Sequence, residues 1–292
     1  MKEITASIVL YNTPEPQLMR LLDCLENSSV RVQTYLVDNS PIPTDLQCFH
    51  WPTITYFKAE RNRGYGAGHN IVLRQILNSA EYHFVLNPDI YFGPTELYKM
   101  VKFMDQDPEI GQLMPRVIYP DGNLQYLCKL LPTPADLFLR RFAFGLLKEM
   151  ATERMHRFEL RHSNYDKVMD VPYLSGCFML FRTSALRQIG LFDERFFMYP
   201  EDIDITRRMH AEYRTVFSPD AVVVHDHARE SYKSIRAFWI HLYNMAKYFT
   251  KWGWFWDEQR VRFNRELLRE IDWQIKGLAQ SVQSQASEAE RI

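Results

Sequence analysis

The alternation of two hydrophobic periods over the first 90 residues constrains the fold more than any other feature of the sequence. Short runs rich in β-branched residues, such as ITASIVLY at 4–11, have the composition of strands. Between them, apolar residues recur at the spacing of one helix face, as at Leu18, Leu21 and Leu25. We expect strands at 4–11, 31–37, 54–57 and 82–86, and helices at 14–25 and 71–77. This repeat predicts an α/β fold with a Rossmann-like, mostly parallel central sheet and helices on both faces.

Polar residues gather where three of the predicted strands end. Asp38-Asn39 follows the second strand, the glycine-rich stretch 62–70 follows the third, and Asn87-Pro88-Asp89 follows the fourth. Ligands of such sheets bind beyond the carboxyl ends of the strands. We therefore expect these three clusters to line one binding site.

The rest of the sequence predicts a continuation of this domain and then a helical extension. We expect a helix at 94–104, a hairpin over 113–127 turning at 120–122, a strand at 176–181, a helix at 183–190, a helix start at 199–202 and a strand at 221–224. From residue 234 the sequence is helical and aromatic, and residues 281–292 are polar without an apolar period. These patterns predict an α/β domain over 1–232, a helical extension over 233–280 and a disordered tail over 281–292.

Charge and cysteine content exclude several classes of protein. The 35 Lys and Arg residues balance 36 Asp and Glu residues for a net charge of −1, so no global field attracts nucleic acid. The 4 cysteines form no C-x-x-C pair, which favours reduced, buried thiols over a zinc ribbon or a disulfide scaffold. The first apolar stretch is too short for a signal peptide, and no run approaches the roughly 18 apolar residues of a membrane span. We expect a cytoplasmic protein that binds no nucleic acid.

Two clusters are candidates for a metal site. Asp89 stands at the rim of the sheet, where a single carboxylate suits Mg²⁺ or Mn²⁺, because such an ion fills its remaining shell with phosphate oxygens and water. The alternative is an Asn-Pro turn in which Asp89 caps the backbone. His225-Asp226-His227 follows an apolar strand, so the alternatives are a pair of ligands, a single ligand at His225, or one packed and one solvated histidine.

The carboxylate pair Glu201-Asp202 opens a predicted helix after an apolar segment. Carboxylates at a helix start are stabilised by the free N–H groups there, and Asp204 can pair with Arg208 four residues later. The apolar wall at 196–199 and the repulsion between neighbouring carboxylates can instead raise the pKa of one of them into the range of a general base. The sequence alone leaves both interpretations open.

The glycine-rich stretch also admits a dinucleotide-binding interpretation. Gly64-x-Gly66 lies between a strand and a helix, and Asp89 follows as a later acid. The third glycine of that motif would stand at position 69, where this chain has His69, and the motif follows the third strand instead of the first. An oxidoreductase is therefore the weaker hypothesis, and the glycines still permit close approach of the backbone to a phosphate or sugar.

Taken in order, these clusters resemble the family 2 inverting glycosyltransferases of the GT-A fold, and within them the bacterial rhamnosyltransferase-like branch. The resemblance runs from Ser7 to about Ser231, roughly three quarters of the chain. Its most specific parts are 175–182 (SGCFMLFR) and 189–204 (IGLFDERFFMYPEDID). It implies a nucleotide-sugar half over about 1–90 and an acceptor half over about 91–232.

The resemblance implies a role for each cluster. Asp38 matches the aspartate that accepts the imide N–H of a pyrimidine base. Asp89 and His225 match the ligands of Mg²⁺ or Mn²⁺ beside the diphosphate, and Asp202 matches the catalytic base. The implied nucleotide-sugar site comprises Tyr11, Asp38, Asn62, Gly64, Asn70, Asn87, Asp89, Gly176 and Glu201. Asn87 departs from the family pattern, because it replaces the first aspartate of the D-x-D motif and so removes one charge from the metal site.

The implied reaction is a single inverting displacement. Asp202 takes the proton of the acceptor hydroxyl while that hydroxyl attacks the anomeric carbon of the donor. The resemblance implies dTDP-rhamnose as the donor and a lipid-linked or growing surface polysaccharide, such as an O-antigen, as the acceptor. The alternative donors are a UDP-hexose or a furanose nucleotide. A catalytically idle sugar-nucleotide-binding protein is a further alternative, which Asn87 leaves open.

Two segments have the composition of membrane-surface anchors. Residues 137–147 place Phe, Leu and Arg in a pattern compatible with an interfacial helix. Trp252, Trp254 and Trp256 stand beside two lysines. The alternative is a helical cap packed on the sheet domain, and we expect Trp239 to pack in that way. Because acceptors in the family are often polyprenyl-diphosphate-linked sugars, we expect a peripheral enzyme on the cytoplasmic face of the inner membrane.

Overall fold

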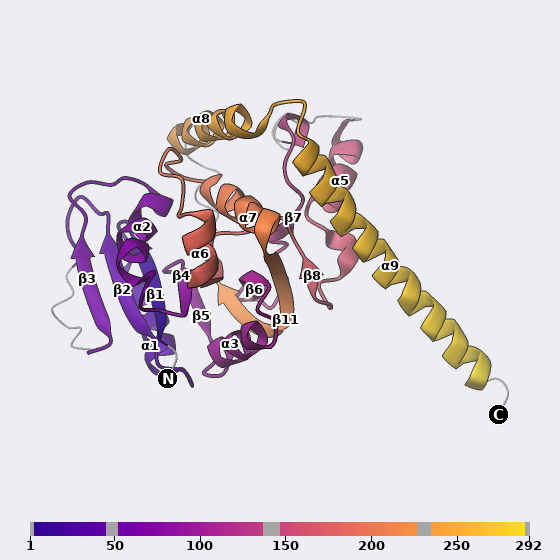
Figure 1. The fold of residues 1–292 in the computed structure, drawn as a ribbon, viewed down its shortest axis with the longest axis horizontal. Coiled ribbons are helices and arrows are strands. Elements are labelled where there is room, and N and C mark those ends of the chain that lie inside the picture. Colours follow the sequence, from indigo (N-terminus) through magenta and orange to yellow (C-terminus); the bar gives the residue numbers. More distant parts are fainter. Residues whose placement is uncertain (1–2, 45–51, 137–146, 227–234, 290–292) are drawn as a thin grey trace.

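The computed structural model describes residues 3–44, 52–136, 147–226 and 235–289, and Figure 1 shows how the elements are arranged. The strands are β1 (Ile4–Leu10), β2 (Gln33–Asp38), β3 (Ile54–Lys58), β4 (Tyr82–Leu86), β5 (Ile90–Phe92), β6 (Ile110–Ile118), β7 (Cys128–Lys129), β8 (Met169–Asp170), β9 (Tyr173–Leu174), β10 (Phe178–Arg182) and β11 (Arg214–His225). The helices are α1 (Glu15–Glu26), α2 (Tyr65–Ile76), α3 (Glu96–Gln106), α5 (Leu147–Phe158), η1 (Arg161–Ser163), α6 (Thr183–Ile189), α7 (Glu201–Glu212), α8 (Ile235–Trp252) and α9 (Glu258–Ala289).

A nine-stranded sheet organises the domain, in the order β3-β2-β1-β4-β10-β6-β11-β5 with β8 paired to β11. β3, β2, β1 and β4 are parallel to one another. β10 runs antiparallel to β4 and β6, and β11 pairs parallel to β6 and antiparallel to β5. The predicted α/β fold is confirmed, and each antiparallel pair includes a strand from after residue 89. Because β2, β3 and β4 are parallel, the polar clusters that follow them meet at one edge of the sheet.

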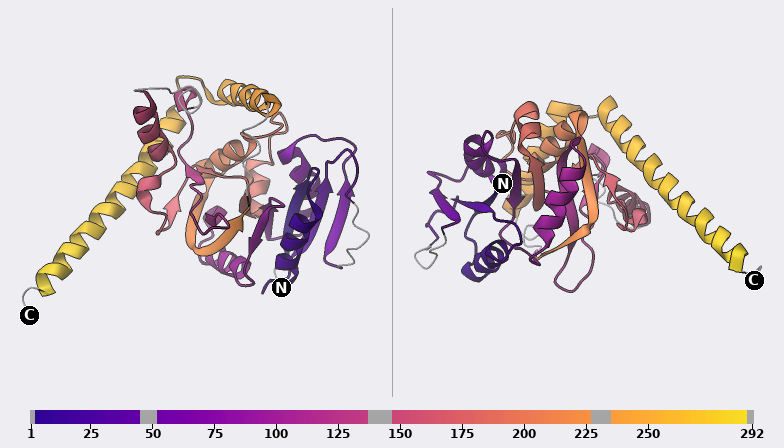
Figure 2. Two further views of the ribbon diagram at one scale, coloured as in Figure 1. Left: turned by 180° about the vertical axis from the view of Figure 1, so that it is seen from behind. Right: turned by 60° about the horizontal axis from the view of Figure 1, so that its bottom comes forward.

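Apolar side chains pack on both faces of this sheet, and helices cover both (Figure 2). On one face, Leu18 and Leu22 of α1 join the larger core cluster. On the other, Val72 and Leu73 of α2 pack with residues of α6 and α7. β1 and β4 are buried along their whole length, and their polar residues Thr5, Ser7 and His83 contact one another inside the core.

The glycine-rich stretch is helical where a loop was predicted. α2 begins at Tyr65, so Gly66 and Gly68 lie inside its first turn. A Cβ at Gly66 would lie 2.8 Å from Cβ of Phe192, and a Cβ at Gly68 would lie 2.7 Å from Cγ2 of Val9. These glycines let α2 pack closely on its neighbours, which overrides their low helix propensity.

The hairpin predicted over 113–127 does not form as such. β6 ends at Ile118, and the predicted turn is present, with the N–H of Gly122 donating to the Tyr119 carbonyl at 2.9 Å. The return consists of a single antiparallel bridge between Ile118 and Leu124. β6 is already paired with β10 on one side and β11 on the other, so it has little free edge for a hairpin partner.

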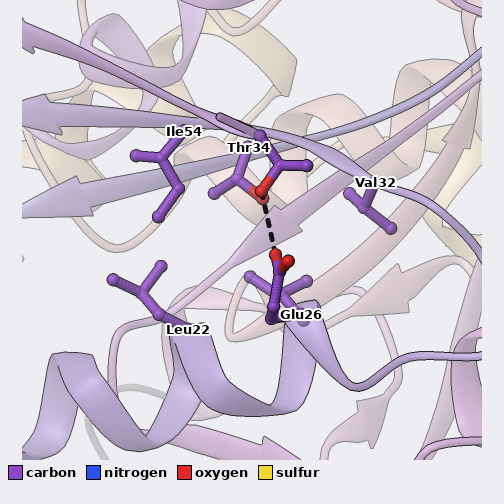
Figure 3. A pocket seen from close by; sticks show the side chains of 7 residues that line it. Leu22, Glu26, Val32, Thr34 and Ile54 are labelled. Atoms are coloured by element: carbon purple, nitrogen blue, oxygen red, sulfur yellow. Dashed lines mark hydrogen bonds between the residues drawn. The ribbon is translucent and has the colours of Figure 1, made fainter. Parts of the chain in front are cut away.

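The gap between α1 and the edge of the sheet is nearly filled (Figure 3). Its cavity measures about 10 Å³, and the Thr53 hydroxyl donates to Oε2 of Glu26 at 3.0 Å across it. A cavity of this size holds one water molecule at most. This side of the sheet therefore offers no ligand site in that gap.

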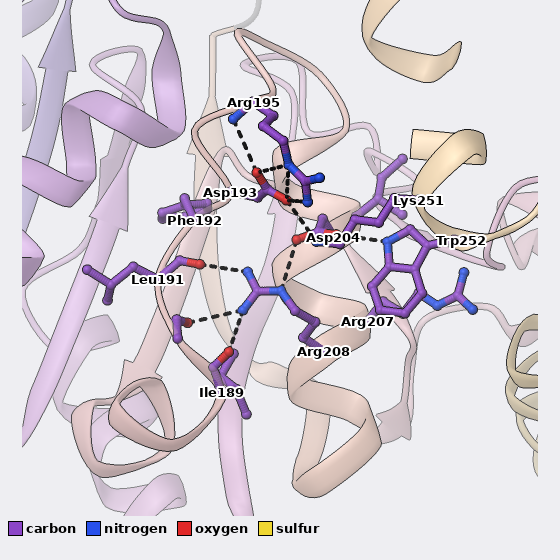
Figure 4. Close-up of polar contacts among 12 residues, drawn as sticks. Ile189, Leu191, Phe192, Asp193, Arg195, Asp204, Arg207, Arg208, Lys251 and Trp252 are labelled. Atoms are coloured by element: carbon purple, nitrogen blue, oxygen red, sulfur yellow. Dashed lines mark hydrogen bonds and ion pairs between the residues drawn. The ribbon is translucent and has the colours of Figure 1, made fainter. Parts of the chain in front are cut away.

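Polar contacts fix α8 on α7 (Figure 4). Nζ of Lys251 lies 2.9 Å from Oδ2 of Asp193 and 2.6 Å from Oδ1 of Asp204. The indole N–H of Trp252 donates to Oδ1 of Asp204 at 2.8 Å. Arg208 contacts the other oxygen of Asp204 at 2.9 Å, which confirms the predicted pair. The buried Asp204 carboxylate thus joins the two helices.

A buried ion pair fixes the start of α9 in the same region. Arg207 of α7 is 1% exposed, and its guanidinium contacts both carboxylate oxygens of Asp257 at 2.8 and 2.5 Å. The Trp252 ring lies 4.1 Å from the same guanidinium. Breaking such a pair leaves a buried charge uncompensated. The helical extension is therefore part of the structure that supports α7.

The aromatic segments differ from their predicted roles. Trp252, predicted to face a membrane, packs inward on Arg207, because a buried cation and carboxylate offer it partners that lipid does not. Trp239, predicted to pack, is 61% exposed. Trp254 and Trp256 are exposed as an anchor requires. Residues 137–146 lie outside the described residues. Across the described ranges, no helix combines the length and apolarity that a membrane span requires.

The last helix extends further than its sequence predicts. α9 continues to Ala289, so it covers most of the predicted disordered tail over 281–292. That stretch lacks an apolar stripe, but it consists largely of Ala, Gln, Glu and Ser. The first three of these have favourable helix propensity, which accounts for a helix in a stretch without an apolar stripe. In Figures 1 and 2 this end of α9 projects away from the sheet.

Candidate active site

Strand pairing brings Asp89 and His225 together at the carboxyl end of β4. β5 starts directly after Asp89 and pairs with the end of β11, with Ile90 opposite His225. The N–H of Asp226 donates to the Asp89 carbonyl at 2.9 Å. In this register Nε2 of His225 lies 3.3 Å from Oδ2 of Asp89. The two predicted metal ligands therefore face each other.

Gln125 orients the imidazole of His225. Nε2 of Gln125 donates to the His225 carbonyl at 2.7 Å, so its Oε1 accepts from Nδ1 of the ring at 2.9 Å. A ring that carries its proton on Nδ1 presents the Nε2 lone pair to Asp89. A lone pair and a carboxylate oxygen at this distance repel each other unless a proton or a metal cation lies between them.

The chemistry of this pair fits a divalent cation that is shared with a substrate. It offers one oxygen and one nitrogen ligand from side chains that are 16% and 7% exposed. Within the described part of the chain, no three His, Cys, Asp or Glu side chains surround one metal position. Mg²⁺ and Mn²⁺ beside a diphosphate take most of their ligands from phosphate and water, so two protein ligands suffice. His227, the other candidate ligand, lies outside the described residues.

α7 begins with two buried carboxylates. Glu201 is 4% exposed and Asp202 is 9% exposed. Oδ2 of Asp202 accepts the N–H of Gly176 at 2.9 Å, and Oδ1 accepts the N–H of Ile203 at 2.8 Å. Oε2 of Glu201 is buried and accepts no hydrogen bond from the described residues. Asp202 is thus held in place by the N–H groups of two other residues, whereas Oε2 of Glu201 has no donor among the described residues.

Burial raises the pKa of both carboxyl groups. It raises the pKa of Asp202 to about 6, against the opposing hydrogen bond from Gly176 and the positive charge of Lys129. Burial and then the charge of Asp202 raise the pKa of Glu201 well above its usual range. Near neutral pH the pair holds one proton and one negative charge, which is the state that a general base requires.

The segment that leads into α7 is strained and is held by α8. Tyr199 has φ +90°, a conformation that side chains other than glycine rarely adopt. Its ring contacts the ring of His241 from α8, with centroids 4.8 Å apart. The N–H of Phe197 donates to Oδ1 of Asn244, also on α8, at 3.4 Å. α8 thus holds the segment that positions the Glu201-Asp202 pair.

Asp38 lies at the end of β2 and is fully buried. Its carboxylate accepts the N–H of Ser40 at 2.8 Å, the N–H of Thr44 at 2.7 Å and the hydroxyl of Tyr56 at 2.8 Å. Burial alone would raise the pKa of Asp38, but these hydrogen bonds hold it below its ordinary value. Asp38 therefore carries a fixed charge that orders the loop after β2. Its contact with a pyrimidine base stays a prediction.

Asn62 and Gly64 shape the start of α2. Oδ1 of Asn62 accepts the N–H of Gly64 at 2.9 Å, and Gly64 has φ +99°. A Cβ at Gly64 would lie 2.1 Å from the Phe197 carbonyl oxygen, which accepts the N–H of Tyr65 at 3.0 Å. The structure thus accounts for Gly64 by the close approach of the segment before α7.

Asn70 is a positioning residue in this structure. It is 1% exposed, its amide group donates to the Phe192 carbonyl at 2.9 Å and to Oε1 of Glu194 at 3.0 Å, and its oxygen accepts the Phe192 N–H at 3.1 Å. Because these bonds use the amide within the chain, we leave Asn70 out of the proposed ligand contacts. It ties α2 to the segment that leads to α7.

The remaining predicted residues lie around the same edge of the sheet. Tyr11 follows β1 and is 53% exposed. The N–H of Asn87 donates to the Cys177 carbonyl at 2.9 Å, which places it beside Gly176. The structure brings Asn87, Gly176 and the Glu201-Asp202 pair into one region and leaves Tyr11 at its open side.

Two residues of this region had no signal in the sequence. Gln125 orients His225, yet it follows a surface turn far away in the chain. Tyr65 donates its hydroxyl to the Gly176 carbonyl at 2.6 Å. The position of Tyr65 in the glycine-rich stretch was visible, but nothing local indicated that its ring reaches toward α7.

The sequence profile of Glycosyl transferase family 2 matches residues 5–190 of this chain. An N-acetylglucosaminyl-diphospho-decaprenol L-rhamnosyltransferase of Mycobacterium tuberculosis is 27% identical over 245 residues, which cover 79% of this chain and 78% of the relative. The rhamnosyltransferase WbbL of Escherichia coli K12 is 25% identical over 254 residues, which cover 84% and 92% of the two chains.

Solved structures share the fold. GalNAc-T7 with UDP, GalNAc and Mn²⁺ superposes with a TM-score of 0.56 at 15% identity, covering 76% of this chain and 43% of that one. The mannosyltransferase PcManGT of Pyrobaculum calidifontis, in complex with GDP-Man and Mn²⁺, superposes with a TM-score of 0.55 at 18% identity, covering 85% and 64%. This chain therefore spans less than two thirds of each of these two structures.

Proposed function

This chain belongs to glycosyl transferase family 2 and is a glycosyltransferase, and we propose that it is a metal-dependent inverting enzyme that transfers L-rhamnose from dTDP-rhamnose to a lipid-linked or growing surface glycan. Family membership replaces the dinucleotide-dependent oxidoreductase hypothesis. The glycines on which that hypothesis depended are accounted for by the close approach of Gly64 to the Phe197 carbonyl and of Gly66 to Phe192.

The observation that carries the proposal is the presence of two chemically different pairs of side chains at one edge of the sheet, one of a carboxylate and an imidazole and the other of two carboxyl groups. Asp89 faces His225 across 3.3 Å, and Glu201 adjoins Asp202 at the start of α7. Cys177 lies close enough to both Asp89 and Asp202 for each charge to raise its pKa. One pair suits a cation beside a diphosphate, and the other suits the removal of a proton.

The proposed reaction consists of one proton transfer and one substitution at the anomeric carbon. Asp202 accepts the proton of the acceptor hydroxyl while the hydroxyl oxygen attacks the anomeric carbon from the face opposite the nucleotide. The bond between that carbon and the diphosphate breaks, and the electron pair leaves with the diphosphate. A divalent cation held by Asp89 and His225 would offset the charge of that leaving group. The remaining proton of the pair stays on Glu201, which keeps Asp202 as the single charged base.

Donor and acceptor are proposed from the relatives. Both curated relatives named above are rhamnosyltransferases, and the name of the mycobacterial one specifies a diphospho-decaprenol acceptor. Asn87 stands where the family motif has an aspartate, so the donor site has one charge fewer than that motif. A UDP-hexose or a furanose nucleotide is the alternative donor.

A donor panel tests this proposal. Purified protein is incubated with dTDP-rhamnose, UDP-hexoses and a furanose nucleotide in Mg²⁺ or Mn²⁺, and release of nucleoside diphosphate is measured with and without a polyprenyl-diphosphate-linked sugar. We expect release from dTDP-rhamnose that depends on the acceptor and is abolished by a chelator. Release from another donor alone would replace the rhamnose assignment, and chelator-resistant release would remove the metal.

We also propose that the enzyme contacts anionic lipid through the outer side of its helical extension. Exposed apolar side chains line one face of α8 and the turn after it: Ile235, Trp239, Leu242, Tyr243, Trp254, Phe255 and Trp256. On α8 they are spaced as one helix face, and Nζ of Lys247 lies 4.3 Å from the Tyr243 ring. Aromatic residues with a nearby cation match the composition of a membrane interface.

Vesicle flotation tests the lipid contact. A protein with Trp239, Phe255 and Trp256 changed to Ser is compared with the parent on vesicles that contain anionic phospholipid. The matched control is Tyr98→Ser, because Tyr98 is 47% exposed on α3 at the opposite end of the molecule from α8 in Figure 1. We expect loss of flotation in the triple variant only. Equal flotation of all three proteins would remove the proposed contact.

A further inference from the structure

Tyr65 connects the start of α2 to the proposed base through the backbone of a single residue, Gly176. Its hydroxyl donates to the Gly176 carbonyl at 2.6 Å. The N–H of the same residue, Gly176, donates to Oδ2 of Asp202 at 2.9 Å. A Cβ on Gly176 would lie 3.1 Å from Cβ of Asp202 and 3.6 Å from Cε1 of Tyr65, so the two side chains flank the glycine closely. Movement of residue 176 therefore changes the geometry of the base.

The phenol stays a hydrogen-bond donor at all relevant pH values. Burial raises the pKa of Tyr65 well above its usual range, and the nearby Cys177, Glu201, Asp202 and Asp89 raise it further. A neutral hydroxyl between acidic groups can donate and cannot compete for the proton of the acceptor. Tyr65 thus has the chemistry of a fixed support, and not that of a second base.

A buried network of hydrogen-bonded side chains lies against the Tyr65 ring. The ring packs edge-on against His69, with centroids 4.5 Å apart. Nδ1 of His69 lies 2.7 Å from the Ser7 hydroxyl, which lies 2.8 Å from Nε2 of His83. Nδ1 of His83 in turn lies 2.7 Å from the Thr5 hydroxyl. Hydrogen bonds that link α2, β1 and β4 in the core restrict the ring to one position.

The groups that face Asp202 come from four elements. Glu201 adjoins it on α7, Lys129 comes from β7, Cys177 precedes β10, and Tyr65 opens α2. Lys129 is the one cation among them. Burial raises the pKa of Cys177 to about 12, so this thiol is neutral. Among the influences that lower the pKa of Asp202 against the effect of burial, the hydrogen bond from the N–H of Gly176 is the largest.

We propose that Tyr65 is a positioning residue for proton transfer, which fixes the backbone of Gly176 and through it the carboxylate of Asp202. This inference rests on the proposed role of Asp202 as the base. The bonded carbonyl and the bonded N–H of Gly176 lie in adjacent peptides that meet at its Cα. Without the hydroxyl, the carbonyl loses its partner, and the backbone dihedrals of Gly176 are less restricted. The hydrogen bond from Gly176 to Asp202 then weakens, and the carboxylate binds its proton more tightly.

The test compares Tyr65→Phe with Tyr213→Phe. Tyr213 donates its hydroxyl to Oε1 of Gln188 at 2.6 Å, so its variant removes the same group from a tyrosine bond outside the site. Nucleoside diphosphate release in the presence of acceptor is measured from pH 4.5 to 8.5. In Tyr65→Phe we expect kcat at pH 7 to fall about three- to tenfold and the acid limb to move up by roughly 0.5 to 1 pH unit. The control should match the parent.

A second variant changes Gly176, the residue through which Tyr65 is proposed to act on Asp202. Gly176→Ala forces the added Cβ against Asp202, so it should also move the acid limb upward. Thermal unfolding of each variant shows whether it folds. An unshifted acid limb with parental kcat in folded Tyr65→Phe overturns the inference, even if Gly176→Ala shifts. If Asp202→Asn keeps parental turnover, the proposed base is wrong, and that result is separate from the behaviour of Tyr65.

Discussion

Two buried acidic regions at the same edge of the sheet have opposite electrostatic behaviour. Asp38 is fully buried and has a lowered pKa, because three groups of its own chain donate hydrogen bonds to it. Asp202 is 9% exposed and has a pKa of about 6, because burial outweighs its two backbone hydrogen bonds. Burial raises the pKa of both carboxyl groups, and the hydrogen bonds outweigh it at Asp38 and not at Asp202. The donors around a buried carboxylate therefore decide whether it is fixed as a charge or is able to take a proton.

The comparison predicts different consequences for the two regions. The charge at Asp38 orders a loop and should matter for binding. The carboxylate at Asp202 exchanges a proton and should matter for turnover. The experiments below test the Asp202 side of this comparison and the buried groups near it, beginning with the largest expected effect.

Replacing the base should give the largest loss. Positioned proton transfer typically contributes about 10²–10⁴-fold, so Asp202→Asn should lose at least about 10²-fold in kcat while the donor still binds. The control is Asp220→Asn at an exposed position of β11. Turnover is measured as nucleoside diphosphate release, and donor affinity by calorimetry. Parental turnover in Asp202→Asn would remove it from this role.

Removing the support of His225 should weaken the metal site. Gln125→Leu takes away the acceptor for Nδ1 and the donor to the carbonyl of His225. Loss of such a supporting partner typically costs about 10–100-fold in metal affinity, so half-maximal activity should require about that much more Mn²⁺. Gln188→Leu, at an exposed position, is the matched control. An unchanged Mn²⁺ requirement would show that Gln125 does not serve a metal ligand.

The buried histidines extend the comparison to stability. Burial lowers the pKa of His83 to about 3, and that of His69 well below its usual range. Below about pH 6.5 the unfolded chain binds protons that the folded chain does not, so stability falls as pH falls toward the folded pKa. For His83 alone the free energy of unfolding should drop by about 2 kcal/mol between pH 7 and pH 5. The raised pKa values of Glu201 and Asp202 act in the opposite direction, so the contribution of His83 is measured as the difference between the parent and His83→Gln in denaturant unfolding at both pH values. The same pH dependence in both proteins would contradict the buried neutral state of His83.

The smallest effect is expected at Glu201. Its raised pKa means that it is already protonated near neutral pH, and Glu201→Gln replaces a neutral acid with a neutral amide. The acid limb of the pH profile should therefore stay within about half a unit of the parent. A downward shift of more than about one unit would mean that Glu201 carries the charge of the pair.

The sequence predicts the parts of the site that depend on strand ends. Asp38 and Asp89 could be placed because parallel strands present their carboxyl ends at one edge, whereas the role of the start of α7 was implied by the family resemblance. The pairing of β5 with β11 could not, because both strands are short or interrupted and their register depends on each other. This pairing is what selects His225 to face Asp89.

The direction in which a side chain points could not be predicted from the sequence. Trp252 and Trp256 are four residues apart with similar neighbours, yet Trp252 packs on a buried arginine and Trp256 is 92% exposed. The difference arises from Asp204 and Arg207 on α7, which nothing near the tryptophans indicates. For the same reason the role of Gln125 emerges only once the chain is folded.

The pH dependence of turnover tests the central claim most directly. Because Asp202 must be ionised to accept a proton, and its pKa is about 6, kcat/KM should rise tenfold per pH unit below that value and level off above it. The parent should show this limb, and the residual activity of Asp202→Asn should lack it. A parental profile that is flat between pH 4.5 and 7, or a limb that survives in Asp202→Asn, would contradict the account.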